Sequence, residues 1–128
     1  MSEPLLSVRD LVVRFDTEDA PRVAVDGVSF DVPSRSTVAI IGESGCGKSV
    51  TAHAVMRILR EPPAEIASGR VLLGGTDLLE LSERKMRKVR GGRIGIVFQD
   101  PESALNPVYS VGYQLMEAYR VQPSISRG

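Results

Sequence analysis

The first quarter of the chain carries a strand-like pattern of hydrophobic residues. Residues 5–15 are rich in leucine and valine and predict a strand. Residues 22–32 alternate between apolar and polar side chains with a period close to two, which predicts a second strand with Asp26-Gly27 as a turn or bulge. Because the segment 16–21 between them is polar and turn-like, we expect the two strands to pair antiparallel.

Short, wholly apolar runs replace this alternation further along the chain. Such runs are typical of strands that are buried on both faces of a sheet. They lie at residues 38–41, 71–73 and 94–98. A Gly-rich turn follows the first run, and residues 48–60 then show helical spacing, with Pro62-Pro63 expected to stop the helix. The side of this helix expected to be buried carries Ala52, Val55, Ile58 and Leu59.

Two more helices are expected in the second half of the chain. Ser82 is positioned to cap a basic helix over residues 83–89, and Ser110 to cap a last helix that ends at residue 119 or 120. Residues 101–107 begin and end with proline and predict a loop. The succession of strand, tight turn, helix and further buried strands predicts an α/β fold with a parallel sheet, to which the N-terminal strand pair adds an antiparallel portion.

Composition narrows the class of protein. Sixteen Lys and Arg residues balance sixteen Asp and Glu residues, and this zero net charge excludes a polyelectrolyte that binds nucleic acid by bulk charge. No apolar run is long enough for a membrane helix, and residues 1–4 lack the blocks of a signal peptide. A single cysteine and a single histidine exclude an internal disulfide and a Cys-rich or multi-His metal site. These features predict a soluble, cytosolic domain or part of one.

One motif carries specific chemistry. Residues 42–49 fit the pattern G-x-x-x-x-G-K-[ST] between a predicted buried strand and a predicted helix. Glycines allow backbone N–H groups to turn toward a phosphate, and the N-terminus of the helix adds unpaired N–H groups and a positive dipole end. We expect Lys48 to reach the β- and γ-phosphates and Ser49 to ligate Mg²⁺. The nucleotide-binding residues predicted here are Gly42, Glu43, Ser44, Gly45, Cys46, Gly47, Lys48, Ser49 and Val50.

The loop alone does not identify the class of protein to which the chain belongs. A Gly-rich strand-to-helix turn with a chance lysine would look the same, and the same cradle serves kinases, GTPases and motors. Several segments of the chain carry sequence patterns that are more specific than the loop alone. They lie at residues 24–30, 38–51, 68–69, 75–79, 93–101 and 105–108. Through these segments the chain resembles the N-terminal half of the ATP-binding subunit of ABC transporters, and most of all the oligopeptide and dipeptide importer branch, of which Leu105-Asn106-Pro107-Val108 is the most specific sign.

The resemblance implies a P-loop NTPase fold of the ABC ATPase type. Its sheet would be mixed, with an antiparallel portion at about residues 5–32, a P-loop core at about 37–100 and the start of a helical subdomain at about 101–128. The domain would be incomplete at its C-terminus. The family's acidic Mg²⁺ ligand, the glutamate after it and the switch histidine lie beyond a Leu-Ser-Gly-Gly-Gln motif, and none of them occurs before Gly128. We therefore expect ATP hydrolysis in the full-length protein and not in this stretch alone.

Further roles are implied by the same resemblance. Phe15 would stack on adenine, unless it is an ordinary strand-end residue. Gln99 matches the Q-loop glutamine, whose amide oxygen would reach Mg²⁺ or the attacking water, unless it is a polar strand terminus. The segment from Gln99 to Tyr109 would contact membrane permease subunits, unless it is a plain surface loop.

The resemblance implies a protein that binds ATP and Mg²⁺. It would form a dimer with a second ATP-binding subunit, either identical or different. It would lie on the cytoplasmic face of the membrane, held there by permease subunits, would be served by a solute-binding protein and would bind no nucleic acid. Its solute would be a peptide, or nickel or another small solute of the same branch. Two other functions stay open: a truncated, non-catalytic nucleotide-binding module, and another P-loop enzyme such as a small-molecule kinase.

Three smaller signals complete the expectations. Cys46 lies inside the loop, and we expect an alkylating reagent to modify it and MgATP to protect it. The basic run from Arg84 to Arg93 lacks interleaved aromatic residues and is interpreted as a solvated helix face, with nucleic-acid or lipid binding as the alternative. His53 follows the loop on the helix and is interpreted as a solvated surface residue.

Overall fold

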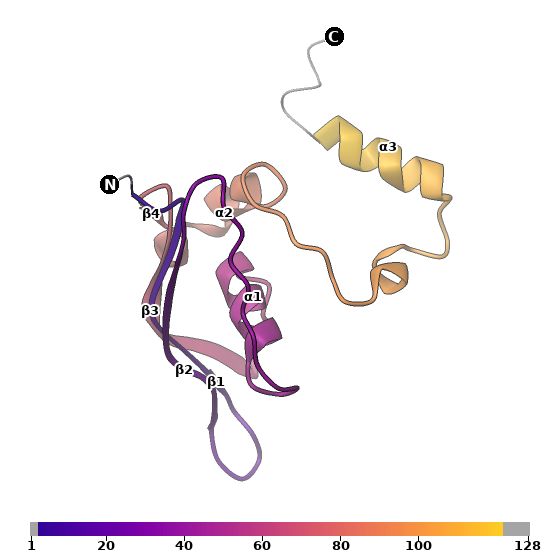
Figure 1. The fold of residues 1–128 in the computed structure, drawn as a ribbon. Coiled ribbons are helices and arrows are strands. Elements are labelled where there is room, and N and C mark those ends of the chain that lie inside the picture. Colours follow the sequence, from indigo (N-terminus) through magenta and orange to yellow (C-terminus); the bar gives the residue numbers. More distant parts are fainter. Residues whose placement is uncertain (1–2, 122–128) are drawn as a thin grey trace. The chain divides into compact units, whose positions relative to one another are not determined.

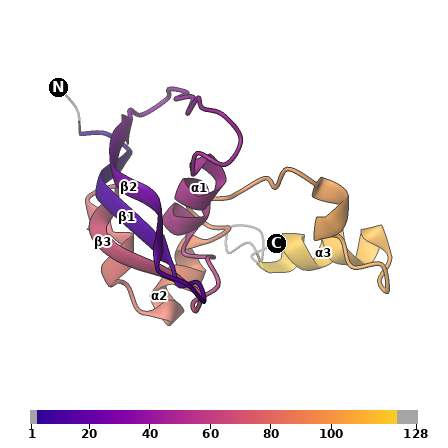
Figure 2. The ribbon, with the colours of Figure 1, turned by 90° about the horizontal axis from the view of Figure 1, so that it is seen from below.

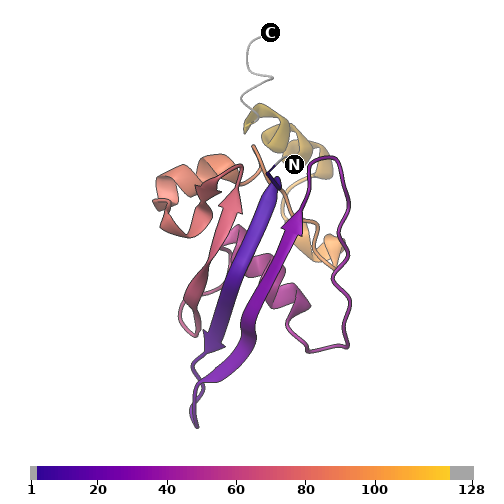
Figure 3. The same cartoon turned by 60° about the vertical axis from the view of Figure 1, so that its left-hand side comes forward.

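The computed structural model describes residues 3–121, and the chain divides into two compact units, one that ends at Ser82 and one that begins at Glu83. The first unit is built on a four-stranded sheet of order β2-β1-β3-β4. Its strands are β1 (Leu6–Phe15), β2 (Arg22–Val32), β3 (Ala64–Leu73) and β4 (Thr76–Asp77). Helix α1 (Lys48–Met56) lies against one face of this sheet, as Figures 1, 2 and 3 show from three sides.

Strand β1 lies between β2 and β3. One extra residue in β1 interrupts the alternation of its buried and exposed side chains. Asp10 has a φ of 47°, and the register with both neighbouring strands shifts just beyond Val8 and Arg9. A bulge of this kind moves the alternation by one position. As a result Val8, Leu11 and Val13 are all fully buried, although their spacing does not follow a period of two. The predicted antiparallel strand pair is confirmed, and Gly27 sits at a second register shift, as the predicted bulge requires.

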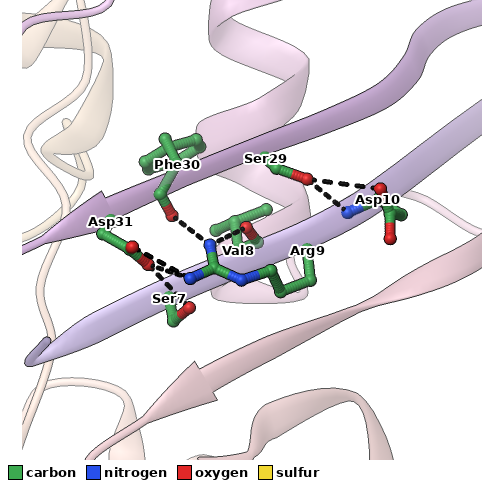
Figure 4. A network of polar contacts seen from close by, with 7 residues as sticks. All are labelled: Ser7, Val8, Arg9, Asp10, Ser29, Phe30 and Asp31. Carbon is green, nitrogen blue, oxygen red and sulfur yellow. Dashed lines mark hydrogen bonds and ion pairs between the residues drawn. The ribbon is translucent and has the colours of Figure 1, made fainter. Parts of the chain in front are cut away.

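A polar cluster joins β1 to β2 on the exposed side of the sheet (Figure 4). One nitrogen of the Arg9 guanidinium contacts both carboxylate oxygens of Asp31, at 2.7 and 2.9 Å, and its other terminal nitrogen donates to the Val8 carbonyl at 3.0 Å. The Ser7 hydroxyl donates to the same carboxylate at 2.7 Å. These contacts hold the pKa of Asp31 below its usual range, first through the hydrogen bond from Arg9 and then through that from Ser7.

This lowered pKa predicts how the strand pair responds to acid. We expect the Asp31 carboxyl to titrate below the pKa of about 3.9 of an unfolded aspartate. A lowered folded-state pKa means that the stabilisation is present above the unfolded value and is lost as the pH falls through the folded value. Side-chain carbonyl NMR shifts recorded against pH will measure this, with Arg9→Ala as the variant that moves the titration upward. An Asp31 midpoint equal in the two proteins would contradict the assignment.

Helix α1 ends earlier than its sequence pattern predicts. The prediction placed its end at residue 60, but Arg57 has a φ of 52° and the helix stops at Met56. The Arg57 guanidinium donates to the carbonyls of Leu78 and Leu81, at 3.0 and 2.7 Å, and so ties this end to η1 (Leu78–Glu80). The predicted buried face was also partly wrong, because Ala52 and Ile58 are exposed. The buried residues of the helix are Thr51, Ala54, Val55 and Met56.

The predicted buried strand at residues 38–41 was wrong for this structure. These residues form no strand, and Ile41 is 93% exposed. A strand needs a hydrogen-bonded neighbour, and no part of residues 3–121 pairs with this segment. The run at residues 71–73 does lie in a strand, but as the end of β3, which pairs antiparallel with β1. The described sheet is therefore antiparallel throughout, and its predicted parallel part is not formed within the described residues.

The second unit contains α2 (Glu83–Val89), η2 (Pro101–Ala104) and α3 (Val111–Val121) (Figure 1). The predicted bounds of α2 are confirmed, and its basic side chains are exposed while Met86 and Val89 are buried. The expected strand at residues 94–98 was wrong, because only Ile94 makes a bridge, to Arg90, and Val97 is 91% exposed. Residues 122–128 of the expected helical subdomain lie outside the described residues.

Within residues 3–121, no helix combines the length and the apolar character that a membrane span requires.

Candidate phosphate-binding site

The loop of residues 42–47 enters α1 directly, so the first residues of that helix belong to the same site. A tight turn shapes the loop, since the Cys46 N–H donates to the Glu43 carbonyl at 3.3 Å. The side of the loop from Gly42 to Cys46 is exposed. The loop is therefore accessible to solvent.

Gly47 seats the loop against the sheet. It is the residue before α1 and has a φ of 95°, a conformation that other residues rarely adopt. A Cβ atom on this residue would lie 2.5 Å from the carbonyl oxygen of Ala24 in β2. The close approach of these two backbones explains in physical terms why glycine stands at this place in the motif.

The Lys48 ammonium closes the loop on itself. Its Nζ donates to the carbonyl oxygens of Gly42 at 2.5 Å and Glu43 at 2.7 Å, and lies 3.5 Å from the Cys46 Sγ. The positive charge is thus held above the loop backbone by neutral carbonyl groups. An anion in the loop would offer this ammonium a stronger, charge-assisted partner than a carbonyl.

Backbone donors without an acceptor follow the loop at the start of α1. The first N–H groups of any helix have no acceptor within the helix. Within the described part of the chain, the N–H groups of Lys48, Ser49 and Val50 have no backbone acceptor, and the first helical bond runs from Thr51 to the Gly47 carbonyl at 2.9 Å. The exposed Ser49 carries a hydroxyl beside these donors. Together with the Lys48 ammonium, these N–H groups form a set of donors that suits a phosphate, and the Ser49 hydroxyl oxygen is the kind of ligand that Mg²⁺ takes.

Thr51 was not among the residues that the sequence singled out. Its side chain is buried, and its hydroxyl donates to the Gly47 carbonyl at 2.8 Å. This hydrogen bond therefore stabilises the junction between the loop and α1. A Thr placed four residues after the motif glycine is a recognisable signal, because Ser and Thr commonly bond back to the carbonyl four residues earlier.

Phe15 lies at the last position of β1, where it pairs with Arg22 on one side and Ala64 on the other. Its side chain is half-buried. Figures 1 and 3 show that β1 ends at the same end of the first unit as the loop that leads into α1. Part of the Phe15 ring is therefore exposed to solvent. Stacking of this ring on a base stays a prediction.

Gln99 belongs to the second unit, where it is exposed on the irregular segment before η2. The first unit by itself therefore brings together the loop and the start of α1, and Gln99 is not part of that set. His53 is half-buried on α1, so the prediction of a solvated side chain was too simple. Cys46 is exposed.

Comparison with known proteins identifies the family of this chain. The family model described as ABC transporter matches residues 25–125. The probable peptide ABC transporter ATP-binding protein y4tR of Sinorhizobium fredii is 49% identical over 96% of this chain and 37% of its own length. The peptidoglycan transport ATP-binding protein YejF of Agrobacterium fabrum is 46% identical over 98% of the chain and 23% of its own length. The oligopeptide transport ATP-binding protein OppD of Bacillus subtilis is 44% identical over 96% and 34%. The chain thus spans between 23% and 37% of the length of these relatives.

Proposed function

Since this chain belongs to the ABC transporter family, we propose that it supplies the phosphate-binding loop of an ATP-binding subunit that powers the import of peptides. The observation that carries the proposal is the loop itself, an exposed turn that the Lys48 ammonium closes and that leads into N–H groups of α1 without backbone acceptors. The names of the relatives support the peptide class of solute.

Each residue of the loop has a role in this proposal. Lys48 exchanges its carbonyl partners Gly42 and Glu43 for phosphate oxygens, and the N–H groups at the start of α1 bind the same phosphates. The Ser49 hydroxyl holds Mg²⁺. When bound, Mg²⁺ neutralises and orients the phosphate oxygens. Gly47 lets the loop lie close to β2, and Thr51 bonds to the Gly47 carbonyl, so that both residues support the position of these donors.

Groups outside the loop would complete the site. We propose that Phe15 stacks on adenine and that Gln99 contributes an amide oxygen to Mg²⁺ or to the attacking water. A second ATP-binding subunit, the permease subunits that contact the segment from Gln99 to Tyr109, and a solute-binding protein would complete the transporter. The protein would then work at the cytoplasmic face of the membrane.

The two rival functions make different predictions. A small-molecule kinase would transfer phosphate to an acceptor, and a non-catalytic module would bind nucleotide without turnover. The match of the family model across residues 25–125 favours the transporter subunit over the kinase. Release of inorganic phosphate in step with solute uptake identifies the transporter subunit, and ADP formed only in the presence of an acceptor identifies the kinase.

The proposal is tested with the full-length polypeptide and its permease in vesicles. We expect calorimetry to show binding of MgATP with a Kd between about 1 μM and 1 mM, the range in which the KM values of most enzymes lie. We also expect ATP hydrolysis that rises when a peptide is transported. Absence of MgATP binding by the folded polypeptide would overturn the proposal, and binding without any hydrolysis would favour the non-catalytic module.

Cys46 offers an independent probe of the same site. It is exposed and lies 3.5 Å from the Lys48 ammonium, so we expect N-ethylmaleimide to alkylate it. MgATP at ten times its Kd should slow this reaction about tenfold, because only the free protein reacts. Peptide mapping by mass spectrometry measures the rate at Cys46, with AMP as the control ligand that lacks the β- and γ-phosphates. Equal rates with MgATP and AMP would contradict the placement of the phosphates in this loop.

A further inference from the structure

The Gly47 carbonyl accepts two hydrogen bonds from Thr51. The Thr51 N–H donates to it at 2.9 Å, which is the first backbone bond of α1, and the Thr51 hydroxyl donates to the same oxygen at 2.8 Å. A carbonyl oxygen has two lone pairs, so these two donors use its whole capacity. The direction of this carbonyl is therefore defined by two bonds, whereas the helix by itself supplies one.

This carbonyl belongs to the peptide unit that joins the loop to α1. The same unit contains the Lys48 N–H, which has no backbone acceptor within residues 3–121. The Gly47–Lys48 bond is trans, and the C=O and N–H of a planar trans unit point in opposite directions. Because the two Thr51 donors hold the carbonyl toward the body of the helix, the Lys48 N–H faces the loop of residues 42–47.

Gly47 is the point at which this peptide unit can rotate. Glycine occupies more backbone conformations than any other residue, and the Ala24 carbonyl lies so close that a Cβ atom on Gly47 would meet it at 2.5 Å. No side chain can therefore restrict the backbone at this position. A rotation of the unit would turn its carbonyl oxygen toward the loop and its N–H away. A phosphate in the loop would then meet an acceptor, which repels it, in place of a donor.

The Thr51 hydroxyl adds little to the stability of the helix itself. The Gly47 carbonyl keeps its bond from the Thr51 N–H whatever side chain stands at this position. Threonine is a weaker helix former than alanine, and a hydroxyl that bonds back to the carbonyl four residues earlier slightly destabilises a helix. The side chain is nonetheless buried, with 5% of its surface exposed. What the hydroxyl adds is a second constraint on the peptide unit before α1.

We propose that Thr51 is a positioning residue whose hydroxyl holds the Gly47–Lys48 peptide unit with its N–H toward the bound phosphate. The hydroxyl acts on the ligand only through this unit, because its proton is used on the Gly47 carbonyl and its side chain is buried. The donor is thus oriented before the ligand arrives, and less conformational freedom is lost on binding. This inference rests on the proposed function, which supplies the phosphate.

Three variants at position 51 of the full-length protein separate the hydroxyl from the methyl group. Thr51→Ala and Thr51→Ser both lose the methyl group, but only serine keeps a hydroxyl that can bond to the Gly47 carbonyl. Thr51→Val keeps the branched side chain and lacks the hydroxyl. The matched control is Thr76→Val, which makes the same change at an exposed position of β4.

Calorimetry with MgATP and with the magnesium salt of inorganic tripolyphosphate measures the effect. We expect Thr51→Ala and Thr51→Val to raise both Kd values about fivefold, which lies in the range that one hydrogen bond contributes. Thr51→Ser keeps the bond and should stay within about twofold of the wild type, as should the surface control Thr76→Val. Tripolyphosphate has no base, so an equal factor for the two ligands locates the effect at the phosphates.

Melting temperatures should rank the variants in a different order. We expect Thr51→Val to lie closest to the wild type, and Thr51→Ser and Thr51→Ala to lie lower, because the lost methyl group leaves a cavity. The valine variant would then be stable but weak in binding, whereas the serine variant would be less stable but would bind. A purely structural role of Thr51 cannot produce this crossing of the two orders.

Three results would overturn the inference. Equal Kd values for MgATP in Thr51→Ser and Thr51→Ala would show that the hydroxyl does not orient the donor. Kd values that rise in step with the fall in melting temperature would assign Thr51 to helix packing alone. A change seen with MgATP but not with tripolyphosphate would place the effect away from the phosphates. Failure of the proposed function is distinct from all three, because the wild-type protein itself would then bind no MgATP.

Discussion

Replacement of Lys48 by alanine should lower the affinity for MgATP about a hundredfold. The ammonium is held over the exposed loop by the carbonyls of Gly42 and Glu43, and no other lysine or arginine lies in the motif. A hydrogen bond to a charged group contributes about 1.5–3 kcal/mol, and loss of about 2.8 kcal/mol equals a hundredfold in Kd. The loop also loses the group that ties its two ends together. Calorimetry on the full-length protein measures the change.

The matched control for this variant is Lys88→Ala. Lys88 is exposed on α2, in the second unit, and its removal changes the net charge by the same amount. We expect it to leave the Kd for MgATP within about twofold, since surface charges contribute little at physiological salt. Lys48→Arg should not rescue binding, because a planar guanidinium cannot replace a compact ammonium in so tight a loop. Wild-type affinity in Lys48→Ala would contradict the site.

Replacement of Gly69 by alanine should cause a large loss in the free energy of unfolding. Gly69 lies in β3 opposite the bulge of β1 and has a φ of 109°. A Cβ atom here would lie 2.6 Å from the Leu11 Cα and within 2.9 Å of two backbone oxygens, those of Arg9 and Asp10. Strained backbone and overpacking each cost about 1–3 kcal/mol, so we expect a loss of about 4 kcal/mol in the free energy of unfolding.

Gly75→Ala separates the two causes. Gly75 also has a positive φ, of 81°, but a Cβ atom there would meet no other atom within 4 Å. Only the backbone strain remains, and we expect a loss of about 1–2 kcal/mol. Urea unfolding of the wild type and both variants gives the three values. Equal losses in the two variants would show that the close approach of β3 to the bulge is not a feature of the folded protein.

Local patterns predicted several elements with the right limits. The alternation over residues 22–32 matches β2, and the start of β1 was misplaced by one residue. Ser82 and Ser110 mark the starts of α2 and α3. These signals are local, because side-chain alternation and capping depend on neighbours in the sequence. The loop and its helix could be predicted for the same reason, whereas their role in binding nucleotide stays a prediction.

The wrong predictions share a cause. The apolar runs at residues 38–41 and 94–98 have the composition of buried strands, but a strand is formed only with a partner. The amino-acid composition of each run does not identify the segment with which it would pair. The run at residues 71–73 did find a partner, in β1, and its direction turned out to be antiparallel. The end of α1 was misjudged because Arg57 bonds to carbonyls more than twenty residues away.

What the sequence determined by itself is therefore the position of the glycine-rich loop, the presence of its helix, and the strands whose alternation is regular. All of these depend on residues within a few positions of one another. Only the tertiary structure decided that β1 lies between β2 and β3, that Gly47 rests on the Ala24 carbonyl, and that Arg57 bonds to the carbonyls of Leu78 and Leu81. Such contacts join residues whose distance in the chain says nothing about their distance in space, and their geometry exists only once the backbone is folded.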